Sequence, residues 1–486
     1  MKPLKGAFPF QAGLITPLFF LAAVMLGCTF NYTLALSGAA PPKDVFPEIK
    51  RRARLSVAGS EAGVDLRVFY APGEEELAAE ALEAVKKPAR FLRDATGITA
   101  GSFASFYLYP LPADGSIPSY APRGPGDFTG VFLYRQGKKL LSIYDNRYWL
   151  IGPYPHELAH SFFEGLRLED RWLGDGLPEY LAWEFAKQHD PEIAKGDNHL
   201  LPPSVVALSL ATLGPWNAVS LRDQKGFEKK LSSDREYALL LAEKMSWQYA
   251  AAKELVRHWM TAARKAGSED PLKNLLSRVR SLGKPVDWNA TRQLAKAQTG
   301  RSFEELARVS EEELSAAQMK AWEERADANL GARVHALSVL AALGLPAGAT
   351  AEELMPAFSI PDELSDVKLG WVRQLIHQGG QALARANDPV AAAKVVELAE
   401  SRWGAEGARF VPPELWQVLA TTNRELALEQ LVATITRPDT ALSIKARAND
   451  ALRLLTGKDV GWSVEATPGE RQQAATRWKD AVSGTA

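Results

Sequence analysis

Residues 155–160 read Pro-His-Glu-Leu-Ala-His, and they contain the pattern His-Glu-x-x-His. Proline suits the first turn of a helix, and in such a helix His156 and His160, four positions apart, project from the same face. Two imidazole nitrogens placed in this way can reach one zinc ion at about 2.0 to 2.1 Å. Glu157 then points toward the open coordination position of the metal. The pattern therefore predicts a zinc site.

Glu157 is the residue from which we expect chemistry. Zinc lowers the pKa of a bound water molecule, and a nearby carboxylate can take the proton as a general base. Glu157 would later pass that proton to the leaving amine. This mechanism supplies a nucleophile at neutral pH without a covalent intermediate, and it predicts hydrolysis of peptide bonds.

A second motif follows the histidines, because residues 172–180 read Trp-Leu-Gly-Asp-Gly-Leu-Pro-Glu-Tyr. The two motifs together resemble those of the gluzincin metallopeptidases, a peptidase MA-like group. In that group a second helix carries a motif like Trp-Leu-x-Glu-Gly-x-x-Glu-Tyr. The resemblance implies that His156 and His160 are zinc ligands, that Glu157 is the general base and that Asp175 is the third ligand. The family usually has glutamate at the position of Asp175.

The choice of third ligand has an alternative. Aspartate is one methylene shorter than glutamate, so a ligand at Asp175 requires the second helix to lie closer; otherwise the ligand is Glu179, on the same helix face. Glu179 stands nineteen positions after His160, the separation found in the aminopeptidase branch. We favour Asp175. Glu179 would then hydrogen-bond the free nitrogen of a ligating histidine, or be an ordinary solvated carboxylate.

A neutral donor for the developing oxyanion is also expected on a later helix. The candidates are Tyr237, Tyr249 and His258, although each can equally be a packing residue. The resemblance further implies an edge strand beside the metal that binds an extended peptide through main-chain hydrogen bonds. Residues 130–134 and 138–144 are the candidates, unless both are scaffold.

The segments before the metal motif predict a small mixed sheet with a helix across it. The sequence after the motif is helical for nearly its whole length. We therefore expect an α+β fold in which residues 46–325 form a zincin-like metallopeptidase domain. The expected elements are a strand at 66–69, a helix at 74–96, a strand at 105–109, a Pro- and Gly-rich loop at 110–127, and a hairpin of 130–134 with 138–144.

Residues 326–486 are predicted to form a second, all-α domain of short helices separated by Pro and Gly breaks. Residues 451–457 (ALRLLTG), with Trp462 and Trp478 after them, resemble the closing unit of HEAT-like repeat proteins. A stacked array presents an extended surface suited to protein partners. An irregular helical bundle is the alternative. Four other tryptophans at apolar helical positions are expected in the core: Trp172, Trp183, Trp247 and Trp259.

Residues 1–45 read as an export signal. Lys2 and Lys5 precede a largely apolar run, and small and turn-forming residues follow at 37–42. Residues 24–28 (VMLGC) resemble a lipoprotein box that would be acylated at Cys28. An uncleaved anchor and an ordinary cleaved signal are the alternatives. In the first two cases the protein is held at a membrane on the extracytoplasmic side.

Composition narrows the classes of function. Fifty-seven Lys and Arg against 58 Asp and Glu give a net charge of −1, which argues against nucleic-acid binding. Since Cys28 is the only cysteine, neither an intrachain disulfide nor a thiolate metal cluster can form. Any metal must be held by histidines and carboxylates.

The sequence thus predicts a membrane-tethered, zinc-dependent peptidase. No motif for anchoring an N-terminal amine is evident, which favours an endopeptidase over an aminopeptidase. One alternative is an inactive zincin scaffold whose helical domain binds protein partners. The other is an ordinary amphipathic helix whose two histidines bind no metal.

Overall fold

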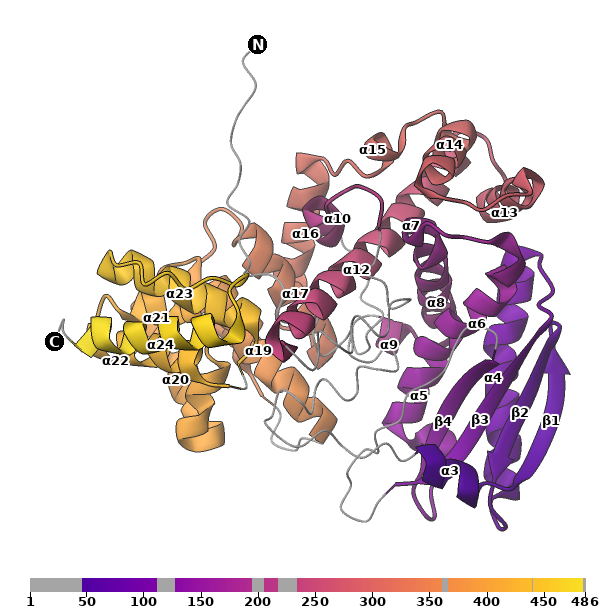
Figure 1. Ribbon diagram of the computed structural model, residues 1–486, viewed down its shortest axis with the longest axis horizontal. Helices are drawn as coiled ribbons and strands as arrows, with labels where there is room; N and C mark the ends of the chain where they lie inside the picture. The colour runs from indigo at the N-terminus through magenta and orange to yellow at the C-terminus, as the bar shows by residue number, and fades with distance from the viewer. Residues whose placement is uncertain are drawn as a thin grey trace.

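The computed structural model describes residues 46–111, 127–194, 205–216, 234–360, 366–438 and 440–483. Within them the fold is α+β, as predicted: a four-stranded mixed sheet near the N-terminus precedes a largely helical region (Figure 1). The predicted signal and anchor segment, and most of the predicted Pro- and Gly-rich loop, lie outside the described residues.

The sheet has the strand order β1-β2-β3-β4. Strands β1 and β2 are antiparallel and are joined at Ala62 and Gly63, which both have positive φ. Strands β2, β3 and β4 are parallel, and helix α4 (Glu75–Thr96) connects β2 to β3. The predicted strands at 66–69 and 105–109 and the predicted helix at 74–96 are therefore confirmed. The strands are β1 (Leu55–Glu61), β2 (Val64–Tyr70), β3 (Ser102–Pro110) and β4 (Asp127–Tyr134).

The predicted hairpin is wrong. Residues 138–144 form no second strand; they contain the short 3-10 helix η3 (Leu140–Ser142) and lead into α5 (Tyr144–Ile151). The reason is the side chain of Asn146, whose Oδ1 accepts the backbone N–H of Leu133 at 2.9 Å and whose Nδ2 donates to the carbonyl of the same residue at 2.5 Å. One amide side chain thus takes the hydrogen bonds that a neighbouring strand would make.

The outer edge of β4 is also closed at Val131. The hydroxyl of Tyr154 accepts the backbone N–H of Val131 at 2.9 Å and donates to its carbonyl at 2.6 Å. The ring approaches the strand closely because Gly130 has no Cβ; a Cβ there would lie 2.8 Å from the ring of Tyr154. With Val131 and Leu133 both engaged, the prediction that residues 130–134 bind a substrate backbone is wrong at these two positions.

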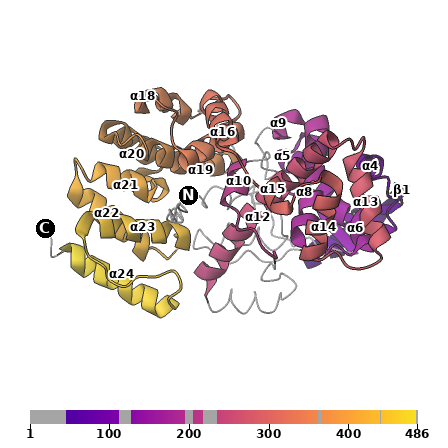
Figure 2. The same ribbon diagram turned by 90° about the horizontal axis from the view of Figure 1, so that it is seen from above.

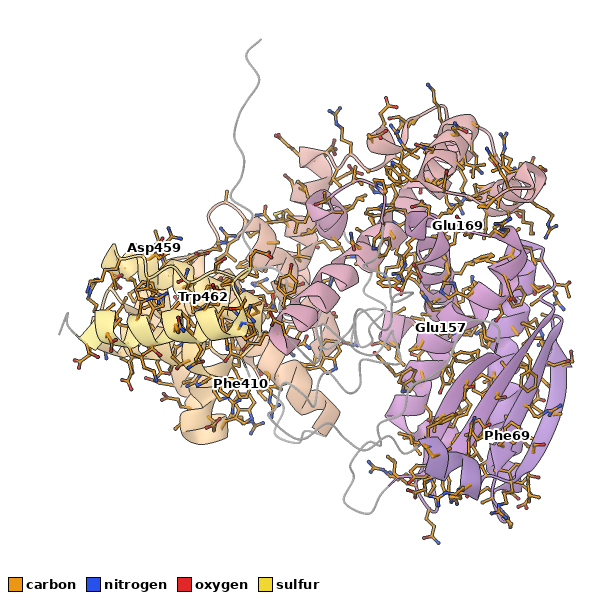
Figure 3. The ribbon with its side chains drawn as sticks, viewed as in Figure 1. Phe69, Glu157, Glu169, Phe410, Asp459 and Trp462 are labelled. Atoms are coloured by element: carbon orange, nitrogen blue, oxygen red, sulfur yellow. The ribbon has the colours of Figure 1, made fainter. Side chains whose placement is uncertain are left out.

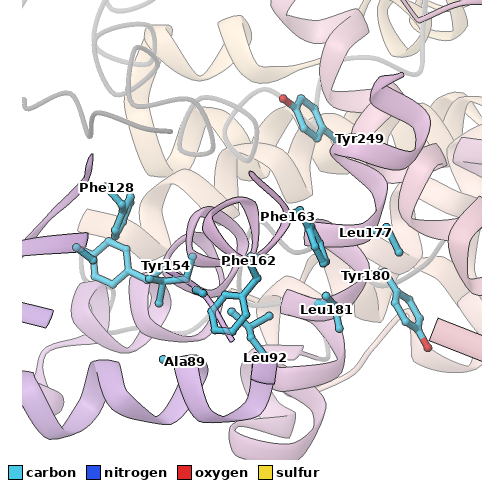
Figure 4. Close-up of a cluster of buried hydrophobic side chains, with 14 of the residues drawn as sticks. Ala89, Leu92, Phe128, Tyr154, Phe162, Phe163, Leu177, Tyr180, Leu181 and Tyr249 are labelled. Carbon is cyan, nitrogen blue, oxygen red and sulfur yellow. The ribbon is translucent and has the colours of Figure 1, made fainter. Parts of the chain in front are cut away.

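Helix α4 lies across β1 and β2, and α6 (Pro153–Phe163) lies beside it against β3 and β4 (Figure 1). Helix α6 begins at Pro153, two residues before Pro155, so Pro153 is the proline at its first position. Figure 4 shows the apolar layer that joins α4, α6 and α8 (Gly176–His189), with Leu92, Phe162 and Leu181 among its members. This layer holds the helix with the two histidines against the sheet.

Helix α12 (Arg235–Lys265) packs along α8. The two approach closely at Gly176, where a Cβ would lie 3.0 Å from the carbonyl oxygen of Ala252 on α12. The other helices that the structure describes before residue 310 are α3 (Phe46–Arg52), η4 (Glu164–Leu166), α7 (Arg171–Gly174), α9 (Pro191–Ala194), α10 (Val205–Leu210), α13 (Pro271–Leu282), α14 (Trp288–Thr299) and α15 (Phe303–Leu306).

The C-terminal helices pack mainly on their neighbours in sequence and form a row in Figure 2. Trp462 and Trp478 are buried there, and the indole N–H of Trp478 donates to Asn449 at 2.8 Å. A strict HEAT-like period stays a prediction. The helices are α16 (Glu311–Glu324), α17 (Leu330–Leu343), α18 (Ala351–Leu354), η6 (Met355–Phe358), α19 (Asp366–Ala384), α20 (Pro389–Trp403), η7 (Gly404–Phe410), α21 (Pro413–Leu419), α22 (Arg424–Thr436), α23 (Leu442–Thr456) and α24 (Pro468–Ser483).

Most of the buried apolar residues fall into two large clusters, and α12 belongs to both. Its Leu240 lies in the cluster of the C-terminal helices, whereas its Tyr249 and Trp259 lie in the cluster around the sheet. Trp172 and Trp259 are fully buried as predicted, and Trp183 is partly buried. Among the described helices none is both long and apolar enough to cross a membrane.

Candidate metal centre

Helix α6 brings two imidazole nitrogens together. Nε2 of His156 and Nε2 of His160 lie 3.1 Å apart, and the two rings meet edge to face. Two nitrogens bound tetrahedrally to one metal at 2.0–2.1 Å would be separated by about 3.3 Å, so this spacing suits a shared ion. His156 is 3% exposed, whereas the side chain of His160 is 26% exposed. The site therefore opens to solvent on the side of His160.

Asp175 completes a group of three potential ligands. Its Oδ1 lies 3.6 Å from Nε2 of His160, and one ligand atom from each of the three residues lies within 4.8 Å of the others. This buried group can hold a metal ion. The predicted placement of Asp175 on a helix face needs correction, because α7 ends at Gly174 and Asp175 is the N-cap of α8.

Glu179 lies on the first turn of α8 and faces the other nitrogen of the first histidine. Its Oε1 is 3.2 Å from Nδ1 of His156, and both side chains are buried. Burial alone would lower the pKa of His156, but the carboxylates of Glu179, Glu157 and Asp175 together outweigh it, so the pKa is raised. A carboxylate at Nδ1 orients the ring so that Nε2 faces the metal group. This is the position predicted for Glu179 if Asp175 is the ligand.

Glu157 is half-buried on α6, and Figure 3 shows it on the side of the sheet-containing part that faces the C-terminal helices. Burial raises its pKa to about 7, and the neighbouring carboxylates of Asp175 and Glu179 add to this effect. A divalent cation at the histidines would lower that pKa again, because it favours the charged form. Burial, reinforced by the charge of His156, lowers the pKa of His160 to about 4. His160 is therefore neutral at pH 7, as a metal ligand must be.

The charges around the histidines suit a cation. The carboxyls of Glu157, Asp175 and Glu179 lie near His156; Asp175 also pairs with Arg171, and Glu179 lies near Lys253. Burial lowers the pKa of Lys253 to about 8 against the opposite effect of nearby carboxylates. Three carboxyls gathered around two imidazoles favour a bound cation, because buried carboxylates need compensating charge. The residues present therefore fit a divalent metal ion.

Of the three predicted oxyanion donors, the structure brings only Tyr249 to the histidines. Its ring centroid lies 6.1 Å from that of His156, and burial raises the pKa of its hydroxyl well above the ordinary value. His258 is engaged elsewhere: its Nε2 lies 3.1 Å from Glu254 and its Nδ1 bonds the carbonyl of Leu306 at 3.0 Å. Tyr237 packs against the C-terminal cluster.

Arg171 is the residue of the site that the sequence did not predict. Its Nε donates to Oδ2 of Asp175, and its Nη2 donates to the hydroxyl of Tyr249 at 2.5 Å. The spacing of four residues between Arg171 and Asp175 was the only signal in the sequence, since such pairs meet on a helix. Lys253, which lies near Glu179, gave no signal apart from its position on an apolar helix.

The structure thus assembles His156, Glu157, His160, Asp175 and Glu179, although their segments come from two separate motifs. It adds one of the three predicted donors and leaves out the other two. The predicted substrate edge at β4 is closed at two residues. The sequence matches no protein-family model, and a search of curated proteins finds no similar chain.

Proposed function

We propose that the protein is a zinc-dependent peptidase. The observation that carries the proposal is the convergence of His156, His160 and Asp175 next to an acidic residue, Glu157, that is not needed as a ligand. Two imidazoles and one carboxylate are a usual protein donor set for catalytic zinc, which keeps one coordination position open. Bound zinc would lower the pKa of a water molecule and polarise the carbonyl of the peptide bond.

Glu157 acts as the general base and acid of the reaction. It takes a proton from the attacking water and delivers it to the nitrogen of the leaving amine, so that no acyl-enzyme forms. Glu157 precedes Leu158, whose side chain is fully buried, and its own side chain is only half-buried. It can therefore reach a substrate from the open side of the site, near His160.

Tyr249 serves as the hydrogen-bond donor to the developing oxyanion. Its hydroxyl oxygen accepts the Nη2–H of Arg171, so the proton of the hydroxyl remains for a substrate oxygen. A donor fixed in a buried site costs little reorganisation when charge develops. The substrate is a peptide or protein, with internal cleavage favoured over removal of N-terminal residues.

The test compares wild type with Glu157→Gln in the full-length chain. We expect near one zinc per chain in both proteins, since Glu157 is not a ligand, and loss of casein or mixed-peptide hydrolysis in the variant alone. Zinc is measured by atomic emission and proteolysis by release of labelled peptides. Bound zinc without activity in either protein would favour a scaffold role, and wild type without zinc would exclude the site.

We also propose that the peptidase acts outside the cytoplasm and is tethered to a membrane by its N-terminus. The support is the order of residues 1–45: two lysines, an apolar run and then small residues. If Cys28 is acylated, Cys28→Ser leaves a soluble or unprocessed form. Membrane fractionation and intact mass check this, and an unchanged result for both would exclude lipidation.

A further inference from the structure

Arg171 holds two groups of the site with one guanidinium. It donates through Nε to Oδ2 of Asp175 and through Nη2 to the hydroxyl of Tyr249. These partners come from different parts of the chain: Asp175 precedes α8, whereas Tyr249 lies on α12, 78 positions from Arg171. The planar guanidinium presents its donors in a fixed fork, so the two partners are fixed relative to each other.

The surroundings of Arg171 keep this fork in one orientation. Its guanidinium carbon lies 5.1 Å from the ring centroid of Trp216 and 5.4 Å from that of Tyr249, and the side chain is only 22% exposed. Trp216 and Tyr249 themselves meet edge to face at 5.3 Å. A cation over aromatic faces gains attraction beyond its hydrogen bonds, so Arg171 is held from several sides.

The two oxygens of Asp175 consequently have different partners. Oδ2 accepts from Arg171, and Oδ1 is the oxygen that lies 3.6 Å from Nε2 of His160. With Oδ2 engaged, only Oδ1 is turned toward the histidines.

We propose that Arg171 is a positioning residue: it restricts Asp175 to one metal-binding oxygen and sets the hydroxyl of Tyr249 at a fixed place relative to that ligand. The inference rests on the proposed function, because it assigns Arg171 a part in the same site. It goes beyond the ligand set, since Arg171 is not one of the candidate ligands and acts through Asp175 and Tyr249.

The test measures zinc affinity by chelator competition in the full-length chain, for wild type, Arg171→Met, Arg171→Lys and Tyr249→Phe. Partners of ligating side chains typically contribute 10- to 100-fold to metal affinity, so we expect Arg171→Met to weaken zinc binding by about that factor. Arg171→Lys retains the charge and should recover part of the loss. Tyr249→Phe should leave the affinity unchanged, because Tyr249 is not a ligand.

A second readout tests the link to Tyr249. At saturating zinc, Arg171→Met and Tyr249→Phe should each lower kcat/KM. The double variant should be no worse than Arg171→Met alone, because loss of Arg171 already removes the positioning of the Tyr249 hydroxyl. The visible absorption of the cobalt-substituted protein should change in Arg171→Met and not in Tyr249→Phe. Arg147→Met, which breaks an Arg–Asp pair with Asp190 in the same part of the molecule, is the matched control.

Each outcome decides the inference. Unchanged zinc affinity and cobalt spectrum in Arg171→Met, with folding intact by circular dichroism, would overturn it, as would additive losses of kcat/KM. If Arg171→Met does not fold, Arg171→Lys is read by the same measurements. Zinc binding without proteolysis in wild type would overturn the proposed function and the role of Tyr249 as a donor. The zinc affinities would still test whether Arg171 positions Asp175. Wild type without zinc would overturn both proposals.

Discussion

At the scale of single residues, the carboxylates of Asp175, at the N-cap of α8, and of Glu179, on its first turn, have different positions relative to the histidines. Asp175 lies near the Nε2 atoms that face each other, whereas Glu179 lies 3.2 Å from Nδ1 of His156. A carboxylate at Nδ1 orients a ligand without binding the metal itself. Asp175 and Glu179 are about one helical turn apart, and we expect the first to bind the metal and the second to orient His156.

Alanine substitutions distinguish these roles. We expect Asp175→Ala to remove most of the zinc, because it deletes a ligand, and Glu179→Ala to remove less, with affinity weakened about 10- to 100-fold. Zinc per chain after gel filtration, with circular dichroism to show retained folding, is the measurement. If Glu179→Ala loses more metal than Asp175→Ala, the ligand assignment is reversed.

The sequence could predict those residues of the site whose roles depend on spacing within a single motif. His156, Glu157 and His160 follow from the period of one helix, and the second motif supplied Asp175 and Glu179. Arg171 could not be predicted as a link to Tyr249, because that contact depends on how α7 and α12 pack and not on any local pattern.

At the scale of elements, the long periodic helices and the inner strands were predictable, whereas the hairpin after β4 was not. A run of apolar and polar residues at 138–144 fits a strand equally well, but the amide of Asn146 occupies the backbone of Leu133. A single side chain that bonds the backbone in place of a strand produces no repeating pattern in the sequence. The same is true of Tyr154 at Val131.

The contact between α19 and α23 contains a buried histidine that makes stability depend on pH. Nε2 of His377 lies 2.8 Å from Nη2 of Arg447, so His377 accepts this hydrogen bond and is neutral. Burial, and then the charge of Arg447, lowers the pKa of His377 well below the ordinary value. Below about pH 6.5 the unfolded chain therefore binds a proton that the folded chain does not, and stability falls as the pH falls.

We expect this histidine to lower the free energy of unfolding by up to about 2 kcal/mol between pH 7 and pH 5. His377→Gln keeps an acceptor for Arg447 but does not titrate, so the variant should lose less stability over the same interval. Urea unfolding of both proteins at the two pH values measures the difference. Equal losses would show that His377 does not contribute to the acid sensitivity.

At the scale of the whole molecule, α12 joins the sheet-containing part to the C-terminal helices through buried charges. Arg471 on α24 pairs with Asp234 at 2.6 Å and lies 3.4 Å from Glu236, and Lys445 on α23 pairs with Glu236 at 2.6 Å. The side chain of Arg471 is only 4% exposed. The beginning of the helix that carries Tyr249 is therefore held by the end of the chain.

Removing this cation should destabilise the protein markedly. Arg471→Met leaves Asp234 without its partner, whereas Glu236 keeps its pair with Lys445. Breaking a buried pair in this way typically costs about 3 kcal/mol. Arg453→Met is the control, since its pair with Asp459 is about half exposed and should contribute about 0.5 kcal/mol or less. Urea unfolding measures both variants, and similar losses in the two would contradict the linking role of Arg471.

The closed edge of β4 also has a consequence for how molecules of this protein meet one another. An edge strand with free backbone groups is a template for joining the sheets of two copies, and such joining leads to aggregation. Tyr154 and Asn146 cover the backbone of β4 at Val131 and Leu133. Self-association by sheet extension is thereby directed away from β4 and toward β1, at the opposite edge of the sheet.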